Sequence, residues 1–322
     1  MIHGGRLEDA RRRFGGRRED WLDLSTGINP VAWVAPDFTE VDWSRLPDPR
    51  ALYHLERTAA AFFGTDPAFC MAVPGSEAGL RGVVRMLGLP GRNRALTYST
   101  HVDAFADLAP DAGAKGSVMV IANPNNPDGL LLAPESLLAL LEQQEREGGW
   151  LLVDEAFVEC HHGFSVAGLV QPGRKLIVSR SFGKFFGLAG LRLGFVIAPP
   201  EVIAPLRRLF GDWPVGAAAV AWGTLAYTDR HWIAKTREAL ATRARDLDAL
   251  LMRHGLTPLG ECPLFRLVES DDAHRLFDAL AERSILTRPF ADHPRLLRFG
   301  VPATEAERVR LGGALAEIAA GA

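Results

Sequence analysis

The sequence predicts an α/β protein with a large domain, whose mostly parallel central sheet is flanked by helices, and a smaller α/β domain. Three observations support this fold class. The 322 residues suit one large and one smaller domain, at roughly 150 residues per domain. Between residues 68 and 198, short apolar runs rich in β-forming residues alternate with amphipathic or polar stretches, as in a parallel sheet covered by helices. After Pro214 the pattern changes to long helical segments.

The first region contains six expected strands. Each is continuously apolar, which is typical of strands that are buried on both faces of a sheet. Helices fit between them; residues 134–147, for example, begin with a proline in the first turn and carry leucines on one face. The expected strands are FCMAV (69–73), RALTY (94–98), SVMVIA (117–122), WLLVD (150–154), KLIVS (175–179) and LGFVIA (193–198).

The second region is expected to begin with helices at 216–228 and 230–254, and a helix as long as the second often spans two domains. A small α/β layer follows, with strands FRLV (265–268) and LLRFGV (296–301), a helix at 272–283 and a helix that opens with the capping box Thr304-x-x-Glu307. We therefore expect three parts. They are an N-terminal arm at 1–45 that packs on the small domain, a large domain at 46–215 and a small C-terminal domain at 216–322.

Composition limits the function classes. With 36 Lys and Arg against 39 Asp and Glu, and 48% hydrophobic residues, the chain is typical of soluble globular proteins, and nucleic acid is not an expected partner. The three scattered cysteines have no spacing suited to zinc, so we expect no metal and buried thiols in a reducing compartment. No signal peptide is visible and no apolar run approaches the roughly 20 residues of a membrane helix, so a cytoplasmic location without a membrane partner is expected. The basic cluster Arg11–Arg13 is interpreted as a solvated helix face rather than an anion site.

Polar residues that directly follow expected strands are the first candidates for a site, because ligands of doubly wound sheets bind beyond the carboxyl ends of the strands. After the first strand, Gly75 to Glu77 form a glycine turn that opens a helix; its N–H groups suit a phosphate, although such turns are common. After the third strand, NPNNPDG (123–129) contains two Asn-Pro steps that end the strand abruptly. The amide of Asn126, held by Pro127, can donate a directed hydrogen bond, which favours a site role over that of a plain loop.

The fourth and fifth strands end in charged and nucleophilic residues. Asp154 ends a buried strand and therefore needs a partner, which can be a structural arginine, a helix N-terminus or a cationic ring nitrogen. Ser181 and Lys184 have the S-x-x-K spacing of a serine nucleophile, but the companion motifs S-D-N and K-T-G are missing. The chain also lacks G-x-S-x-G, H-E-x-x-H, Walker A and G-x-G-x-x-G motifs. Pyridoxal phosphate (PLP) would use all four places, since it needs a lysine, a carboxylate at its ring nitrogen and phosphate ligands.

Four motifs together resemble the signature of fold type I PLP-dependent enzymes, the aspartate aminotransferase superfamily. They are GSEAG (75–79), NPNNPDG (123–129), DEAF (154–157) and SFGKFFGLAGLRLGF (181–195). Four further motifs are similar to the branch that holds histidinol-phosphate aminotransferases and threonine-phosphate decarboxylases: HGG (3–5), STGINP (25–30), LPDP (46–49) and LRFGVP (297–302). The HGG start and the lysine motif are most similar to the decarboxylases. The resemblance implies a PLP-dependent transferase-like fold.

The resemblance also implies roles at the cofactor. Lys184 would form the Schiff base with PLP and carry a proton, Asp154 would pair with the pyridine nitrogen, and Asn126 would bond the phenolic oxygen. The PLP phosphate would be held by backbone groups of the Gly75–Glu77 turn and by two side chains. In full, the implied cofactor residues are Gly75, Ser76, Glu77, His101, Asn126, Asp154, Ser181, Lys184 and Arg192, with His101 stacking on the ring where relatives have an aromatic residue.

The substrate carboxylate is expected to meet Arg298, whose guanidinium fork matches it, with help from Asn29. His3 and Arg288 lie at positions that resemble the family's contacts to a substrate phosphate, so the implied partner is a small phosphorylated amino acid. Two departures from the family stand out. Phe157 replaces a tyrosine and cannot bond the cofactor, and Leu46 replaces a tyrosine that reaches across the dimer, although the family still implies a homodimer.

The reaction depends on which bond at Cα stands perpendicular to the cofactor ring, and the sequence shows no torsion angle. The resemblance implies decarboxylation of L-threonine O-3-phosphate to (R)-1-amino-2-propanol O-2-phosphate in cobalamin biosynthesis. Two alternatives stay open: a histidinol-phosphate-type or other class I/II aminotransferase, and a catalytically inactive PLP-fold binding module. Loss of a key residue would have indicated the second, but Lys184, Asp154, Asn126 and Arg192 are all present.

Overall fold

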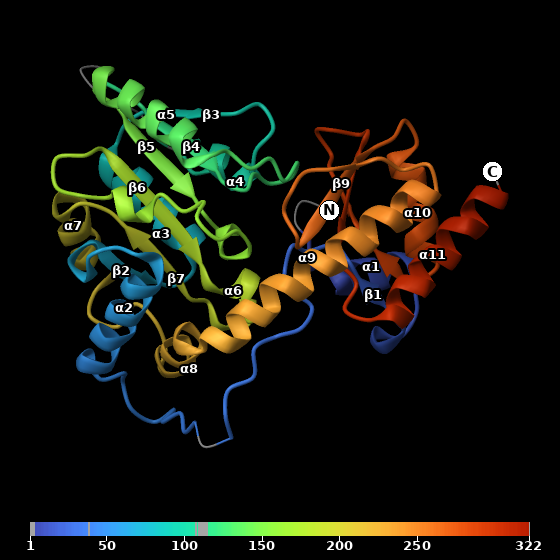
Figure 1. Ribbon diagram of the computed structural model, residues 1–322, viewed down its shortest axis with the longest axis horizontal. Coiled ribbons are helices and arrows are strands. Elements are labelled where there is room, and N and C mark those ends of the chain that lie inside the picture. The colour runs from blue at the N-terminus through green and yellow to red at the C-terminus, as the bar shows by residue number, and fades with distance from the viewer. Residues whose placement is uncertain (1–3, 38, 107, 109–114, 322) are drawn as a thin grey trace. The chain divides into compact units, whose positions relative to one another are not determined.

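The computed structural model describes residues 4–37, 39–106, 108 and 115–321 (Figure 1). It divides into two compact units. The first unit holds the described residues of 1–31, 127–130 and 235–322, and the second unit those of 32–126 and 131–234. Residues 32–45 and 216–234, expected in the arm and in the small domain, thus belong to the second unit. The reason is local packing: a Cβ at Gly223 in helix α8 (Ala217–Thr228) would lie 3.0 Å from Leu55 of helix α2 (Pro49–Phe63).

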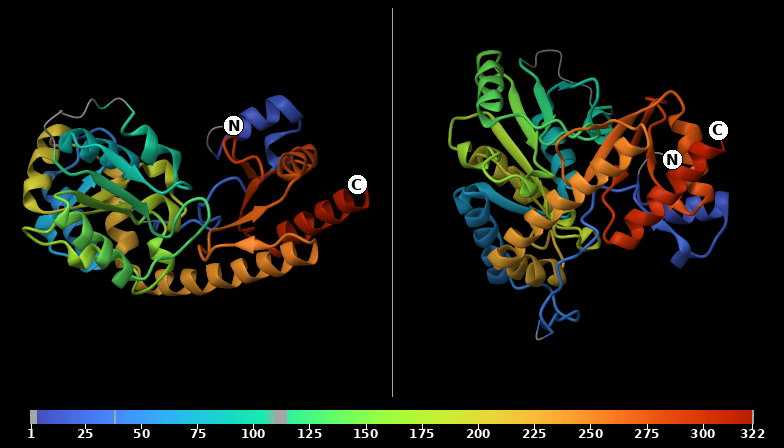
Figure 2. Two further views of the ribbon diagram at one scale, coloured as in Figure 1. Left: turned by 90° about the horizontal axis from the view of Figure 1, so that it is seen from above. Right: turned by 45° about the vertical axis from the view of Figure 1, so that its right-hand side comes forward.

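The second unit is built on a six-stranded sheet in its described residues (Figures 1 and 2). Strands β3 to β6 are parallel, and β7 is antiparallel to both of its neighbours. Its order is β2 (Cys70–Val73), β7 (Gly194–Ile197), β6 (Leu176–Ser181), β5 (Trp150–Asp154), β4 (Val118–Ala122) and β3 (Gly91–Asn93). The mostly parallel sheet predicted from the sequence is therefore confirmed.

Helices cover both faces of this sheet. On one face, α3 (Ser76–Leu87) and α7 (Pro200–Phe210) share an apolar cluster with strand residues that include Leu152, Ile177 and Val196. On the other face, Phe63 of α2 and Tyr227 of α8 pack against Phe195, the neighbour of Val196. Because successive side chains of a strand point to opposite faces, each strand is buried from both sides, as its continuous apolar character predicts.

Three further helices of the second unit lie between the strands of its sheet. They are α4 (Ser99–Asp103), α5 (Pro134–Arg146) and α6 (Phe182–Phe185), with single 3-10 turns at Pro67–Phe69, Val158–Cys160, Ala167–Leu169 and Ala189–Leu191. The helix expected at 134–147 is confirmed. Five expected strands are confirmed within two residues, but the strand expected at 94–98 is wrong. The edge strand β3 ends at Asn93, and the apolar residues that follow belong to a loop that is held by a bond from Asn125 Nδ2 to Leu96 O (3.0 Å).

The first unit contains two small sheets in its described residues. In the larger, antiparallel one, the order is β11 (Arg288–Pro289), β12 (Leu296–Gly300), β9 (Phe265–Glu269) and β8 (Pro258–Leu259). In the other, β1 (Leu22–Asp23) pairs in parallel with β10 (Ile285–Leu286). The helices are α1 (Leu7–Phe14), α10 (Ala273–Glu282), α11 (Glu305–Ala320) and the part of α9 (Arg230–Arg253) that follows residue 234, with a 3-10 turn at Arg18–Asp20. The capping box of α11 forms as expected, since Thr304 Oγ1 accepts from Glu307 N (3.2 Å).

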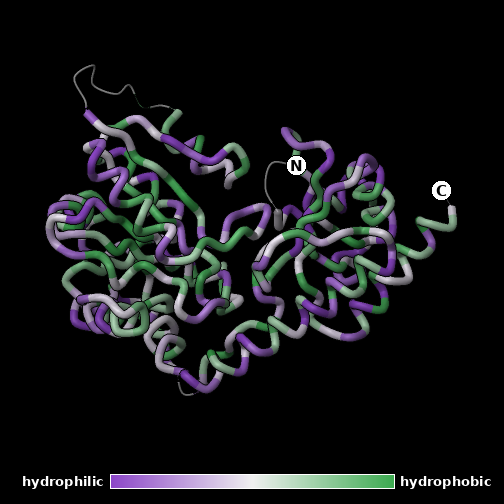
Figure 3. Tube along the Cα trace, turned by 45° about the horizontal axis from the view of Figure 1, so that its top comes forward, coloured by the Kyte–Doolittle hydropathy of each residue, from purple (hydrophilic) through white to green (hydrophobic). Residues whose placement is uncertain are grey.

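The N-terminal residues pack on helix α10, which belongs to the same unit. Phe14 meets Phe277 edge to face at 6.1 Å between ring centroids, and Arg13 pairs with Asp278 (2.9 Å). Arg11 pairs with Glu8 within α1 (2.7 Å). The basic cluster is thus a solvated helix face, in line with its interpretation from the sequence. In Figure 3, hydrophobic and hydrophilic stretches alternate along the chain. No described helix is both long and apolar enough to cross a lipid bilayer.

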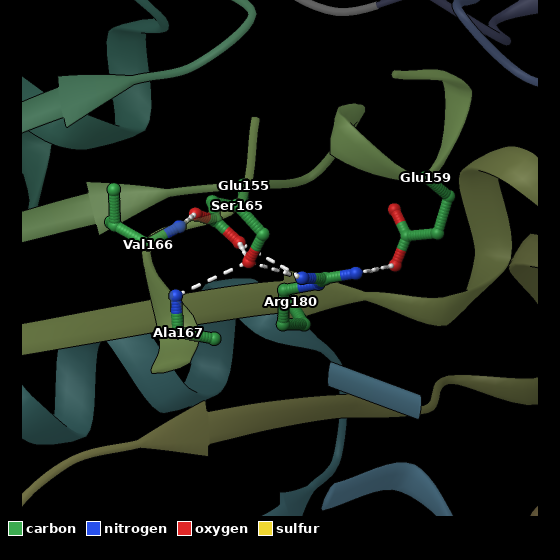
Figure 4. Close-up of polar contacts among 6 residues, drawn as sticks. All are labelled: Glu155, Glu159, Ser165, Val166, Ala167 and Arg180. Carbon is green, nitrogen blue, oxygen red and sulfur yellow. Dashed lines mark hydrogen bonds and ion pairs between the residues drawn. The ribbon is translucent and has the colours of Figure 1, made fainter. Parts of the chain in front are cut away.

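A buried cluster of charges lies beside the ends of β5 and β6 (Figure 4). Arg180 Nη1 donates to Glu155 (2.9 Å), and its Nη2 donates to Glu159 (2.9 Å). Ser165 Oγ donates to Glu155 (2.7 Å) and accepts from Arg180 (3.1 Å), and the guanidinium lies 4.3 Å from the ring centroid of Phe63. All three charged side chains are at most 3% exposed.

Burial and mutual attraction set the charge states of this cluster. Burial raises the pKa of Glu155, and the charge of Arg180 opposes that shift. Burial by itself would lower the pKa of Arg180, but Glu159 and Glu155 outweigh it and raise the pKa. One guanidinium therefore holds two carboxylates, and loss of the guanidinium would leave both buried without their cation.

Replacement of this arginine gives the first prediction. Arg180→Ala is expected to lower the free energy of unfolding of the cofactor-free protein by about 3–5 kcal/mol, because breaking a buried ion pair strands the remaining charge. Urea unfolding followed by circular dichroism measures the change. The exposed Arg208→Ala is the control and is expected to stay within about 0.5 kcal/mol of the parent. Equal stability of the two variants would contradict the prediction.

Candidate functional site

The ends of β5 and β6 carry the expected acid and one expected phosphate ligand on the same face of the sheet. Asp154 is paired in register with Ser179, and Ser181 lies two residues further along β6. Since side chains alternate along a strand, these three point to the face covered by α3 and α7, whereas Glu155 and Arg180 point to the other face. The two faces of the same strand ends thus carry a candidate site and a buried ion cluster.

Asp154 is a buried carboxylate with one oxygen bonded and one open. Its Oδ2 lies 3.0 Å from His101 Nε2, while its Oδ1 is buried and has no hydrogen-bond partner among the described residues. A buried carboxylate oxygen without a donor is costly, so this atom is suited to a donor that arrives with a ligand. The protonated ring nitrogen of PLP is such a donor, and Asp154 therefore fits the cofactor expected from the sequence.

His101 is held by both of its ring nitrogens. Nε2 faces Asp154, and Nδ1 lies 2.9 Å from Thr97 Oγ1. An ionised carboxylate can only accept, so Nε2 carries a proton in this arrangement. The edge of the imidazole therefore orients the carboxylate of Asp154. This contact could not be predicted from the sequence, because no pattern links residues 53 positions apart. Its stacking role stays a prediction, and the half-buried Tyr98, 5.6 Å from His101 between ring centroids, is a second aromatic candidate.

The expected phosphate ligands converge where α3 begins. A Cβ at Gly75 would lie 2.7 Å from Arg192 Nη2, and Gly75 has φ 90°, which favours glycine. Ser181 is paired with Gly194 across β6 and β7, and a Cβ at Gly194 would overlap the backbone nitrogen of Ser76. Two glycines thus leave space in a cradle formed by a helix N-terminus, an arginine and a serine, which suits a phosphate.

Two details complete the cradle. Arg192 itself adopts a left-handed conformation with φ 51°, which is uncommon for a residue with a side chain. The side chain of Glu77 pairs with Arg81 (3.1 Å), so Glu77 can offer a ligand its backbone N–H but its carboxylate is engaged. The role expected for Glu77, through the backbone only, is compatible with this geometry.

Lys184 lies in the short helix α6, which begins directly after β6. The helix is fixed by its aromatic neighbours: Phe182 stacks on Phe186 at 4.5 Å, and Phe186 stacks on Trp232 at 5.6 Å between ring centroids. Gly183 packs so closely on Ala189 that a Cβ would lie 2.5 Å from its Cα. Phe182, Phe185 and Phe186 are fully buried, whereas Lys184 is half-buried.

The loop after β4 is braced by its asparagines. Asn123 Oδ1 accepts from Leu132 N (2.8 Å) and its Nδ2 donates to Leu132 O (3.1 Å), while Asn125 donates to Leu96 O (3.0 Å). Asn123 and Asn125 are buried, and Asn126 is half-buried at the end of the braced segment. The first two amides hold the loop, which leaves Asn126 as the candidate for a cofactor contact.

The first unit brings together the residues expected at the substrate. Arg288 and Arg298 are paired directly across β11 and β12. Arg298 is buried and lies over Phe265, 4.8 Å from the ring centroid, and its Nη2 donates to Ser25 O (3.1 Å). Like charges on opposite positions of an antiparallel pair repel, so a ligand with negative charge would relieve this arrangement.

The two further residues expected at the substrate are Asn29 and His3. Asn29 is buried, and its Oδ1 accepts from Val31 N (3.0 Å), which fixes the side-chain amide in the turn that follows β1. His3 lies outside the described residues. Among the described residues, no group of three or more His, Cys, Asp and Glu side chains could hold a metal ion.

Known proteins are similar to this chain over most of its length. The family model of aminotransferase class I and II matches residues 93–312. The chain is 41% identical to a threonine-phosphate decarboxylase of Sinorhizobium sp, over 99% of this chain and 98% of the relative. It is 39% identical to a threonine-phosphate decarboxylase of Pseudomonas aeruginosa, over 98% of this chain and 97% of the relative.

Histidinol-phosphate aminotransferases are also similar, over less of the chain or at lower identity. The one of Symbiobacterium thermophilum is 34% identical over 60% of this chain and 52% of its own length. The crystal structure of histidinol-phosphate aminotransferase from Sinorhizobium meliloti in complex with pyridoxal-5'-phosphate has a TM-score of 0.75 and 22% identity, over 85% of this chain and 83% of that chain. The chain therefore belongs to the aminotransferase class I and II family.

Proposed function

We propose that the protein is a PLP-dependent decarboxylase that converts L-threonine O-3-phosphate to (R)-1-amino-2-propanol O-2-phosphate and CO₂, in cobalamin biosynthesis. The observation that carries this proposal is the similarity to two threonine-phosphate decarboxylases at 39% and 41% identity over nearly the full length of both chains. The paired Arg288 and Arg298 support it, since the substrate carries a carboxylate and a phosphate.

When bound, PLP supplies an electron sink for the bond that breaks at Cα. Lys184 would attach the cofactor through Nζ and later deliver a proton to Cα. Asp154 would keep the ring nitrogen protonated through its open Oδ1, supported by His101 at Oδ2. Ser181, Arg192 and the backbone N–H groups of Gly75, Ser76 and Glu77 would hold the PLP phosphate, and Asn126 the phenolic oxygen.

The substrate would be bound by residues of the first unit. Arg298 and Asn29 would hold the carboxylate, and Arg288 and His3 the phosphate. In this assignment Arg298 binds the group that leaves as CO₂, so its contact fixes the direction of the breaking bond as well as the affinity. An aminotransferase would need the same carboxylate contact, so only the fate of the carboxylate distinguishes the two reactions.

A homodimer in the cytoplasm is part of the proposal. In the second unit, Trp43, Leu46 and Tyr53 are 79%, 66% and 57% exposed, and segment 40–54 borders an apolar groove of about 520 Å³ against α8. Large exposed apolar side chains next to a groove mark an interaction site. We infer that a second copy covers this face. The cytoplasmic assignment is supported by the three cysteines, which form no disulfide.

The reaction itself is the second prediction. Purified protein with PLP and L-threonine O-3-phosphate is expected to release CO₂ and yield the amino alcohol phosphate, measured by CO₂ trapping and mass spectrometry. Lys184→Ala is expected to lose at least about a thousandfold in rate, because the covalent attachment and the proton carrier are both removed. The exposed Lys235→Ala is the matched control and should retain the parent rate.

Two outcomes would contradict the proposed reaction. Amino transfer to 2-oxoglutarate without CO₂ release would make the protein an aminotransferase. A protein that stays colourless after addition of PLP would be a binding module, since a lysine-bound cofactor absorbs visible light.

The contact between His101 and Asp154 gives the third prediction. His101→Phe keeps an aromatic ring but removes the donor to Asp154, so it is expected to weaken PLP binding about tenfold and to lower the decarboxylation rate. Titration of the cofactor-free protein with PLP measures the dissociation constant. Thr97→Val, which removes only the outer contact at Nδ1, should have a smaller effect. PLP affinity equal to that of the parent in His101→Phe would show that the ring acts by stacking alone.

The fourth prediction concerns the dimer. Trp43→Glu with Leu46→Glu introduces charge on the exposed apolar face and is expected to shift the protein from dimer to monomer, because buried unpaired charge opposes association. Analytical ultracentrifugation at matched concentrations measures the mass. Val309→Glu, at a position 63% exposed on α11, is the control. A dimer that survives the double substitution would locate the interface elsewhere.

A further inference from the structure

The peptide at Ser25 is fixed from two sides by the sheets of the first unit. Leu24 N donates to Leu286 O (2.7 Å), and Gly300 N donates to Leu24 O (2.7 Å). Gly300 lies so close that a Cβ would be 2.7 Å from Thr26 O. Backbone hydrogen bonds therefore hold this segment from both sides.

Ser25 links three groups that are far apart in the sequence. Its carbonyl oxygen accepts from Arg298 Nη2 (3.1 Å), and its Oγ accepts from Gly5 N (2.8 Å) and donates to Asp23 Oδ1 (2.6 Å). A Cβ at Gly4 would overlap the same carbonyl oxygen and would lie 3.0 Å from the Ser25 carbonyl carbon. Gly4 and Arg298 thus meet the same peptide group.

The two glycines serve different purposes. Gly5 has φ 75°, so it is a glycine for its conformation. At Gly4 what requires glycine is space: the nearest atoms that a side chain would meet are the backbone carbonyl atoms of Ser25. Alanine at Gly4 would therefore push on the carbonyl that holds Arg298 without straining its own backbone.

We propose that Gly4, Gly5 and Ser25 form a positioning element for Arg298, which we call the Ser25 seat. The seat holds Nη2 of the guanidinium through the Ser25 carbonyl and thereby sets the direction in which the guanidinium faces the carboxylate of the substrate. This inference rests on the proposed function for the identity of the ligand. The residues of the seat touch neither substrate nor cofactor in this assignment and act through Arg298.

The physical reason is the shape of the guanidinium. A planar fork binds a carboxylate through two parallel hydrogen bonds, so a small rotation weakens both at once. Arg298 is buried over the ring of Phe265, and its hydrogen bond to the Ser25 carbonyl limits rotation of the guanidinium over that ring. A displaced carbonyl therefore weakens carboxylate binding more than phosphate binding, because the Ser25 carbonyl contacts Arg298.

The test compares two ligands on the PLP-loaded protein: L-threonine O-3-phosphate and (R)-1-amino-2-propanol O-2-phosphate, which lacks the carboxylate. Gly4→Ala is expected to weaken binding of the first about tenfold and to change binding of the second by less than about twofold. Gly313→Ala, an exposed position of α11 with open space around it, is the matched control and should leave both ligands unchanged. The dissociation constant of PLP should be the same in all three proteins.

A double-mutant cycle separates action through Arg298 from action through the neighbouring His3. In an Arg298→Met background, Gly4→Ala should have no further effect on L-threonine O-3-phosphate binding. Ser25→Ala adds no atoms and removes the acceptor of Gly5 N, so it should shift binding in the same direction as Gly4→Ala. It replaces Gly4→Ala in the test if that variant does not fold. Equal weakening of both ligands by Gly4→Ala and Ser25→Ala, or an undiminished Gly4→Ala effect in the Arg298→Met background, would overturn the seat.

Failure of the proposed function would give a different result. If the parent protein binds and converts another amino acid, that amino acid and the amine without its carboxylate replace the ligand pair, and the same ratio of affinities tests the seat. The proposed function would then be wrong, but the experiment would still test the role of Gly4.

Discussion

The structure of the site depends on one buried carboxylate, Asp154, at the end of β5. Its Oδ2 is held by His101, and its Oδ1 stays buried with no partner among the described residues. Such an atom is costly in an apolar sheet, so the surroundings must prevent it from moving toward solvent. The ion cluster of Glu155, Glu159 and Arg180 does this from the other face, because it ties the residues next to Asp154 and Ser181 to each other. On one face of the sheet, Asp154 Oδ1 has no partner among the described residues. On the other face, the ion cluster of Arg180 holds the ends of β5 and β6 together.

Side chains alternate between the two faces along a strand, and this explains how much of the site could be predicted from the sequence. Asp154 and Ser181 end strands that are recognisable by their apolar runs, so their place at one edge of the sheet follows from the rule that the ends of parallel strands meet there, and Lys184 follows the second of these strands. The family resemblance assigned chemistry to these places. The residues on the other face carry no such signal: Arg180 sits inside an expected strand, and its two carboxylate partners are 21 and 25 positions away.

Other features could not be predicted because they depend on long-range packing. The reversed direction of β7 is invisible in an apolar run, since both neighbours bury it equally. The run at 94–98 has strand composition, but its residues are half-buried or exposed, and Leu96 O is held by the side chain of Asn125 rather than by a neighbouring strand. The unit boundary after Val31 depends on the unit against which the following residues pack. The role proposed for Gly4 depends on its distance to Ser25, which the sequence does not show.

The opposed arginines of β11 and β12 have a thermodynamic consequence. Arg288 and Arg298 carry like charges at directly opposed positions, and an anion that bound to both would stabilise the folded first unit relative to the unfolded chain. Ligand binding and folding of this unit are therefore linked, so its melting temperature rises with the concentration of a bridging anion. If these arginines bind the substrate as proposed, inorganic phosphate and other multivalent anions in the solvent would compete with it, so the apparent affinity would depend on the medium as well as on the protein.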